Sequence, residues 1–126
     1  MNEILKIKYS LISVSDKKDI GSLAKELKKL KVKIISTGNT SKELKKNKVL
    51  VKKVEDITNF PEILSGRVKT LHPKIFGGLL AKSEDQNHLK QIKKFKIPQI
   101  QLLVVNLYPF EHTIKSNQPI EKCIEN

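Results

Sequence analysis

The sequence predicts an α/β fold, a parallel sheet with helices on both faces. Three largely apolar runs, at residues 9–14, 32–35 and 102–105, have the length of strands. A segment with apolar side chains at helical spacing separates the first two runs. Largely apolar strands that alternate with amphipathic helices are typical of a parallel sheet buried on both faces.

The first half of the chain predicts two strand–helix units and a third strand. The helix after the first run has an apolar stripe, and Ser15 or Asp16 can cap it. After the second run, Thr40 and Glu43 predict a capping box that opens a short helix. A third strand is expected at residues 49–54. The stripe of the first helix consists of Ile20, Leu23, Ala24, Leu27 and Leu30.

The second half continues the same alternation. Ser83 and Gln86 predict a capping box at the start of a further helix, and the third apolar run adds a strand. Pro119 suits the first turn of a last helix. The apolar side of the first of these helices consists of Leu89, Ile92 and Phe95.

Length and composition predict a single domain over residues 1–126, located in the cytoplasm. A single cysteine cannot form an intramolecular disulfide, and no stretch reaches the roughly 20 apolar residues of a membrane span. The first residues lack the features of a signal peptide. We therefore expect no membrane partner.

The net charge of +12 raises the possibility of a nucleic-acid partner. However, the lysines are spread over the polar sides of the predicted helices, aromatic residues are few, and Arg67 is the one arginine. Proteins that bind nucleic acid specifically tend to use arginine and stacking aromatic residues as well. We therefore expect no specific nucleic-acid binding, and generic binding of polyanions is the weaker alternative.

Hydroxyl groups follow two predicted strands, each where a helix begins. Ser13, Ser15 and Lys17 follow the first strand, although plain helix capping also explains the first turn. The second turn consists of Ser36, Thr37, Gly38, Asn39 and Thr40. Helix starts favour phosphate, glycine allows close approach to a ligand, and parallel sheets bind ligands beyond the carboxyl ends of their strands. Together the two turns predict a site for a phosphorylated small molecule.

Two further segments have side chains suited to this chemistry. Arg67 offers a rigid fork of donors, and Lys69 is a candidate for proton transfer. His72 is either structural or catalytic. After the third run, Asn106 can bond the edge of a heterocycle and Tyr108 can donate to a developing oxyanion. The three histidines lack metal-ligand spacing, so no metal site is predicted.

Five segments resemble, in the same order, the cyclohydrolase domain of the bifunctional AICAR formyltransferase/IMP cyclohydrolase family. The most specific is GRVKTLHPK at residues 66–74, and the others are residues 11–17, 36–40, 59–62 and 106–110. The resemblance implies a methylglyoxal-synthase-like fold and closure of formyl-AICAR to IMP with loss of water. It also implies a homodimer and no metal or redox cofactor.

The same resemblance assigns roles to individual residues. Lys69 and Tyr108 would assist ring closure, and Val105 and Asn106 would meet the base. The implied substrate-binding residues are Ser13, Ser15, Asp16, Lys17, Ser36, Thr37, Gly38, Asn39, Thr40, Arg67, Val68, Lys69, Thr70, Val105 and Asn106.

Three residues depart from the family pattern. Asn39 and Asn59 stand where glycine is usual, and asparagine tolerates the left-handed region, so both turns are expected to survive. Phe76 stands where histidine is common, which makes that part of the site apolar. The family also continues into an Ile-Asp-Ile-Gly-Gly segment, a lysine further on and a formyltransferase domain, none of which this sequence contains.

We therefore expect a cyclohydrolase-type domain that is incomplete at its C-terminus and weakly active. The alternative is a module of the same fold that binds a nucleotide or another phosphorylated metabolite without turning it over.

Overall fold

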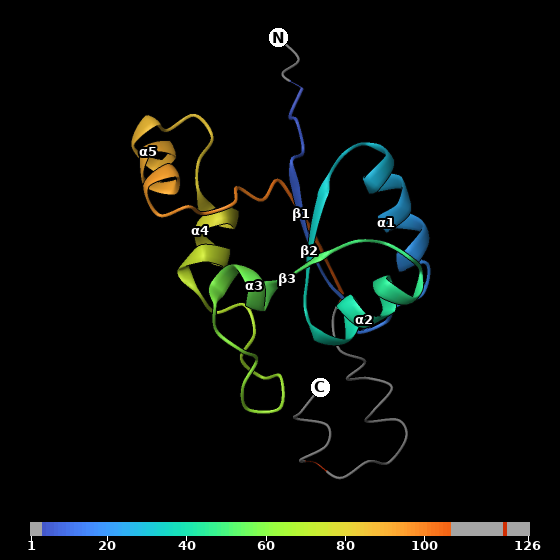
Figure 1. Ribbon diagram of the computed structural model, residues 1–126. Coiled ribbons are helices and arrows are strands. Elements are labelled where there is room, and N and C mark those ends of the chain that lie inside the picture. The colour runs from blue at the N-terminus through green and yellow to red at the C-terminus, as the bar shows by residue number, and fades with distance from the viewer. Residues whose placement is uncertain (1–3, 107–119, 121–126) are drawn as a thin grey trace.

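The structure, a computed structural model, contains a four-stranded sheet in the order β3-β2-β1-β4 (Figure 1). It describes residues 4–106 and residue 120. The strands are β1 (Tyr9–Ser13), β2 (Lys33–Ser36), β3 (Lys52–Lys53) and β4 (Leu102–Val105). Every neighbouring pair is parallel. The predicted parallel α/β fold is thus confirmed.

Helices cover both faces of the sheet (Figure 1). On one face lie α1 (Ile20–Lys29) and α2 (Gly38–Lys46), and on the other lie α3 (Val54–Thr58) and α4 (Pro73–Leu80). The fifth helix, α5 (Gln86–Lys94), lies farther out, beside α4 and toward the amino ends of the strands. None of the described helices is long and apolar enough to cross a membrane.

The two faces of the central strands build two cores. Leu11 pairs with Ile35 in register, and both pack with Ile75 of α4. Their neighbours Ile12 and Ile34 point to the opposite face, into the core that α1 and α2 cover. A buried aliphatic side chain of this size contributes about 1.5–3 kcal/mol, so these strands anchor the domain.

Both helices at the predicted site begin differently from the prediction. The N-cap of α1 is Asp19, in the left-handed region at φ 61 with no side-chain cap, instead of Ser15 or Asp16. The second helix, α2, begins at Gly38, earlier than the predicted box of Thr40 and Glu43. The Thr40 hydroxyl bonds to Val14, directly after β1, instead of capping the helix. At the start of α2 a tertiary contact therefore replaces the predicted local cap.

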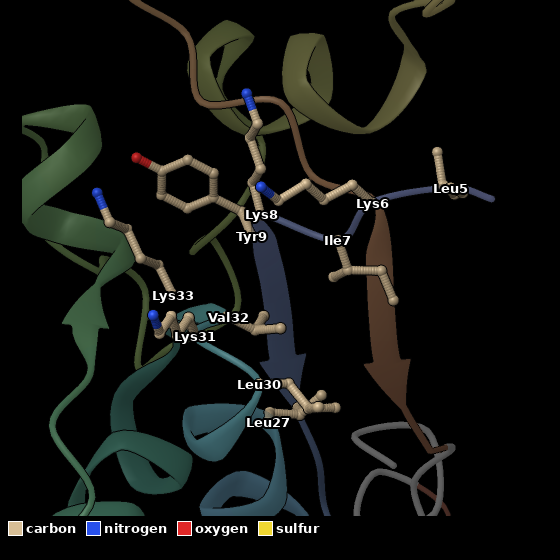
Figure 2. Close-up of a pocket in the computed structure, with 10 residues that line it drawn as sticks. All are labelled: Leu5, Lys6, Ile7, Lys8, Tyr9, Leu27, Leu30, Lys31, Val32 and Lys33. Carbon is tan, nitrogen blue, oxygen red and sulfur yellow. The ribbon is translucent and has the colours of Figure 1, made fainter.

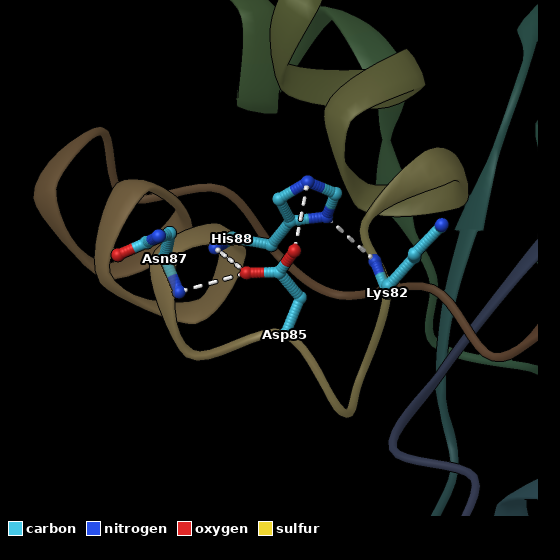
Figure 3. A network of polar contacts seen from close by, with 4 residues as sticks. All are labelled: Lys82, Asp85, Asn87 and His88. Atoms are coloured by element: carbon cyan, nitrogen blue, oxygen red, sulfur yellow. Dashed lines mark hydrogen bonds and ion pairs between the residues drawn. The ribbon is translucent and has the colours of Figure 1, made fainter.

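The predicted cap of α5 is also wrong (Figure 3). Asp85, not Ser83, is the N-cap, and its Oδ1 accepts from the backbone N–H groups of Asn87 at 2.9 Å and His88 at 3.2 Å. The His88 ring Nδ1 in turn accepts from Lys82 N at 3.0 Å. This network closes the loop between α4 and α5.

Other elements differ in extent. Of the strand predicted at residues 49–54, only Lys52 and Lys53 form β3, and Val54 is already the first residue of α3. His72, left open between two roles, caps α4 by accepting from Lys74 N at 3.1 Å, and Pro73 fills the first helical position. Leu30 of the predicted apolar stripe is 73% exposed. The helix predicted after Pro119 lies outside the described residues, apart from residue 120.

Candidate functional site

Two adjoining cavities lie at the carboxyl ends of β1, β2 and β4. Their volumes are about 320 Å³ and 560 Å³, and Ser13, Asn39 and Lys69 line both. The first is also lined by Val14, Ser15, Lys17, Thr37, Thr40 and Asn106. The second is also lined by Ser65, Gly66, Arg67, Val68, Thr70, Leu71 and Phe76. The structure thus brings together most of the residues predicted for the site.

Buried hydroxyl groups join the ends of β1 and β2. Ser13 Oγ lies 2.8 Å from Thr37 Oγ1. The Thr40 hydroxyl donates to Val14 O and accepts from Val14 N, both at 3.2 Å. The bonds of Thr40 are buried, and the bond between Ser13 and Thr37 is partly buried. The wall of the first cavity is therefore fixed before any ligand arrives.

The side chain of Asn106 fastens the loop after β1 to the end of β4. Its Oδ1 accepts from Ser15 N at 2.7 Å and from Asp16 N at 3.3 Å, while its Nδ2 donates to Asp16 O at 2.8 Å. Three hydrogen bonds use most of the capacity of one amide group. In this structure Asn106 therefore orders a loop of the cavity wall.

The charged side chains described in the lining of both cavities are all cations. Lys17 folds back over its own loop and donates from Nζ to Val14 O at 2.9 Å and Ser15 O at 3.1 Å. Lys69 lies where the cavities meet, and Arg67 lines the second. No carboxylate occurs among the described lining residues. The site is therefore electropositive and suits an anion.

A tight hairpin presents Arg67 to the second cavity. Leu64, Ser65 and Gly66 all lie in the left-handed region, with φ of 54, 58 and 79. Gly66 N donates to Ile63 O at 3.1 Å and Arg67 N donates to Leu64 O at 3.2 Å. Left-handed backbone costs a non-glycine residue about 1–2 kcal/mol, so this strained turn persists only because the surrounding structure holds it.

Several predicted residues lie elsewhere. Ser36 is fully buried and donates to Ser41 Oγ at 2.9 Å, so it lines neither cavity. The carboxylate of Asp16 also lines neither cavity and accepts from Lys18 N at 3.0 Å. Val105 ends β4 without lining them. Tyr108 lies outside the described residues.

The departures from the family pattern have separate consequences. The backbone of Asn59 is in the left-handed region, at φ 54, and asparagine tolerates this region. Asn39 is part of α2 and is not among the described residues with positive φ, so no left-handed backbone is needed there. Phe76 is 41% exposed and lines the second cavity, which gives that cavity an apolar patch.

Sequence reasoning missed Glu62. Its Oε1 accepts from Gly38 N at 2.8 Å, across 24 positions of sequence. A Cβ on Gly38 would lie 2.9 Å from the same oxygen. The sequence predicted that a ligand would approach Gly38 closely. In the structure, the group that approaches Gly38 is the Glu62 carboxylate. The local sequence offers no signal for such a long-range bond.

A further cavity of about 710 Å³, larger than either of the two at the carboxyl ends of the strands, lies at the opposite, amino end of β1 and β2 (Figure 2). Lysine side chains and apolar side chains both lie around the amino end of β1 in this view. Lys33 Nζ lies 5.6 Å from the centre of the Tyr9 ring. The lysines are Lys6, Lys8, Lys31 and Lys33, and the apolar residues are Leu5, Ile7, Leu27, Leu30 and Val32.

These features define a class of protein, a small parallel α/β domain with an electropositive cavity at the carboxyl ends of its strands. The model of the MGS-like domain family matches residues 19–126. The chain belongs to this family.

Curated relatives narrow the comparison further. The chain is 54% identical to the bifunctional purine biosynthesis protein PurH of Clostridioides difficile (strain 630) over 119 residues, 94% of this chain and 23% of that protein. It is 55% identical to PurH of Thermoanaerobacter sp. (strain X514) over 120 residues, 94% and 24% of the two proteins. The match is to the N-terminal region of PurH, which confirms the resemblance drawn from the sequence. The chain spans about a quarter of the length of these relatives.

A solved structure shares the fold. The crystal structure of ForH aligns with a TM-score of 0.73 and 33% sequence identity, over 81% of this chain and 53% of that chain.

Proposed function

We propose that this chain acts in cytoplasmic purine biosynthesis as an IMP cyclohydrolase, closing formyl-AICAR to IMP. The observation behind the proposal is that residues from four separate segments of the chain line one electropositive double cavity. Those segments match the PurH-like pattern of the sequence, and the chain is similar to PurH.

The first cavity suits the phosphate of the nucleotide. At the start of α2, Glu62 accepts from Gly38 N, while the backbone N–H groups of Asn39 and Thr40 have no partner within the helix and lie at the positive end of its dipole. The hydroxyls of Ser13 and Thr37 and the ammonium group of Lys17 lie around the same space. Because these groups are already held by hydrogen bonds, binding orders few side chains.

The second cavity suits the reacting end of the substrate. In ring closure, the carboxamide nitrogen attacks the formyl carbon, a C–N bond forms and the formyl oxygen gains charge. Proton transfer gives a carbinolamine, whose C–O bond then breaks and releases water. Lys69, at the junction of the cavities, can stabilise the oxygen and transfer protons, and Arg67 can orient the carboxamide. We assign Tyr108 to the same proton transfers from the family pattern alone.

Turnover of formyl-AICAR, followed by the appearance of IMP, tests this function. We expect slow but measurable turnover by the wild type and a loss of at least about 100-fold in Lys69→Met, the lower end of the range for a proton-transfer group. Lys33→Met, at the amino end of the sheet, is the matched control and should retain activity. Turnover that survives Lys69→Met would contradict the assignment.

A specific observation favours the alternative of a non-catalytic binding module. Phe76 places an aromatic ring in the second cavity, where the family commonly has histidine. An apolar ring can occupy the cavity without assisting proton transfer. Saturable IMP binding without turnover would favour this alternative.

We also propose that the chain forms a homodimer. The proposal comes from the family pattern, and Leu64, Leu71 and Leu80, which are 65%, 77% and 72% exposed, offer apolar side chains for such a contact. Sedimentation velocity should show a dimer at micromolar concentration, and a monomer at all concentrations would contradict it.

A further inference from the structure

One carboxylate connects the two segments that build the double cavity. Glu62 is half-buried and its Oε1 accepts from Gly38 N at 2.8 Å. Gly38 is the first residue of α2, where backbone N–H groups have no partner within the helix. A carboxylate at this position forms a charge-assisted bond and also meets the positive end of the helix dipole.

The other oxygen of Glu62 faces the hairpin. The position of a Cβ on Gly66 would lie 3.7 Å from Glu62 Oε2. The same position lies 3.3 Å from Lys69 Cε and 3.7 Å from Lys69 Nζ. Glu62 and Lys69 therefore both flank Gly66, and the carboxylate lies between the turn of α2 and the segment that bears the cations.

Glycine at both contact points makes room for this arrangement. A Cβ on Gly38 would lie 2.9 Å and 3.0 Å from the two oxygens of Glu62, closer than real Cβ contacts. The backbone of Gly66 has φ 79, a conformation that residues with a side chain rarely adopt. Neither Gly38 nor Glu62 is among the residues that line the two cavities. Glu62 is thus placed to act through its neighbours and not by touching the ligand.

We propose that Glu62 is a positioning residue of the nucleotide site. By accepting from Gly38 N, it fixes the turn of α2 relative to the hairpin of Arg67 and Lys69, so that both are set for one ligand. This inference rests on the proposed function, because IMP is the ligand whose two ends the two segments would hold.

Calorimetric titration with IMP tests the proposal through three proteins. Glu62→Gln keeps an oxygen that can accept from Gly38 N, and its Kd should stay within about threefold of the wild type. Glu62→Ala loses the acceptor, and its Kd should rise at least about tenfold, the scale of one charge-assisted hydrogen bond. Affinity in Glu62→Ala equal to the wild type, or equal losses in both variants, would overturn the proposal.

A matched control separates positioning from general destabilisation. Asp85→Ala removes the cap of α5, away from both cavities, and should lower Tm while leaving the Kd for IMP unchanged. If the Kd values of all variants followed their Tm values, Glu62 would be merely structural.

A ligand-free measurement keeps the inference distinct from the proposed function. Hydrogen exchange at the Gly38 amide should be faster in Glu62→Ala than in Glu62→Gln, with shifted amide signals for residues 66–69. Absence of both effects overturns the positioning role even if IMP binds. A wild type that fails to bind IMP contradicts the proposed function, whereas the exchange result still decides whether Glu62 links the two segments.

Discussion

The two ends of the sheet both present sizeable, positively charged cavities, but they hold their polar groups differently. At the carboxyl end, Ser13, Thr37 and Asn106 bond to neighbouring segments. At the amino end, the larger cavity has lysines around apolar side chains. The side-chain contacts described there include Gln101 Oε1, which accepts from the backbone of Lys8 and Tyr9, and Lys33 Nζ, which lies 5.6 Å from the centre of the Tyr9 ring.

The comparison shows that neither volume nor charge identifies the site. An exposed lysine loses side-chain entropy when it orders around a ligand, whereas a hydroxyl already fixed by a hydrogen bond loses little. Specific recognition of a small anion therefore favours the carboxyl end. The amino end can attract anions without selecting among them.

The largest loss of IMP affinity should come from removing the guanidinium group of Arg67, at the carboxyl end of the sheet. Arg67→Ala should weaken IMP binding by about 100-fold, because two charge-assisted hydrogen bonds are worth roughly 3 kcal/mol or more. Lys33→Ala, which removes one cation at the amino end, should change the Kd less than about twofold. Calorimetry measures the Kd for IMP of both variants. Similar losses of affinity in both would show that the two ends of the sheet do not differ in IMP binding.

A smaller effect is expected from the hydroxyl pair that fixes the first cavity. Thr37→Val keeps the shape of the side chain but removes the bond to Ser13, and should weaken IMP binding about tenfold at a stability cost of about 1 kcal/mol. Ser36→Ala is the control, since Ser36 is equally buried but lines neither cavity. It should lose similar stability in urea and no affinity. Lost affinity in Ser36→Ala would show that burial alone explains the result.

The smallest effect on IMP binding should come from the lysines of the amino end. A variant with Lys6, Lys8, Lys31 and Lys33 changed to glutamine should bind IMP within about twofold of the wild type. Its affinity for duplex DNA should fall, because generic polyanion binding follows the number of phosphates neutralised and weakens steeply with salt. Fluorescence anisotropy with labelled DNA at two salt concentrations provides the second measurement. An IMP affinity that fell with DNA affinity would place the nucleotide at the wrong end.

The sequence predicted the fold where local pattern and burial agree. The strand at residues 102–105 matches β4, and the hydroxyl-rich turns after β1 and β2 lie at the same edge because parallel strands end together. The predicted caps failed for different reasons, because Thr40 has a distant partner whereas Asp16 and Ser83 bond to residues near them in the sequence. Thr40 bonds to Val14, and Asp85, closer to the helix start, replaces Ser83.

The part of the site that could not be predicted depends on contacts between distant segments. Glu62 reaches Gly38 only because the segment that follows α3 comes close to the start of α2. Likewise, the amide of Asn106 looked available for a ligand in the sequence, whereas folding uses it to hold Ser15 and Asp16. Such partners have no local periodicity, so only the assembled structure reveals them.

Amide chemical shifts recorded during an IMP titration test the central claim most directly, because they report both ends of the sheet in one experiment. The account predicts saturable shifts at residues 13–17, 37–40 and 66–70, with residues 5–9 and 31–33 unchanged. Shifts concentrated at residues 5–9 and 31–33, or none in a folded protein at millimolar IMP, would contradict it.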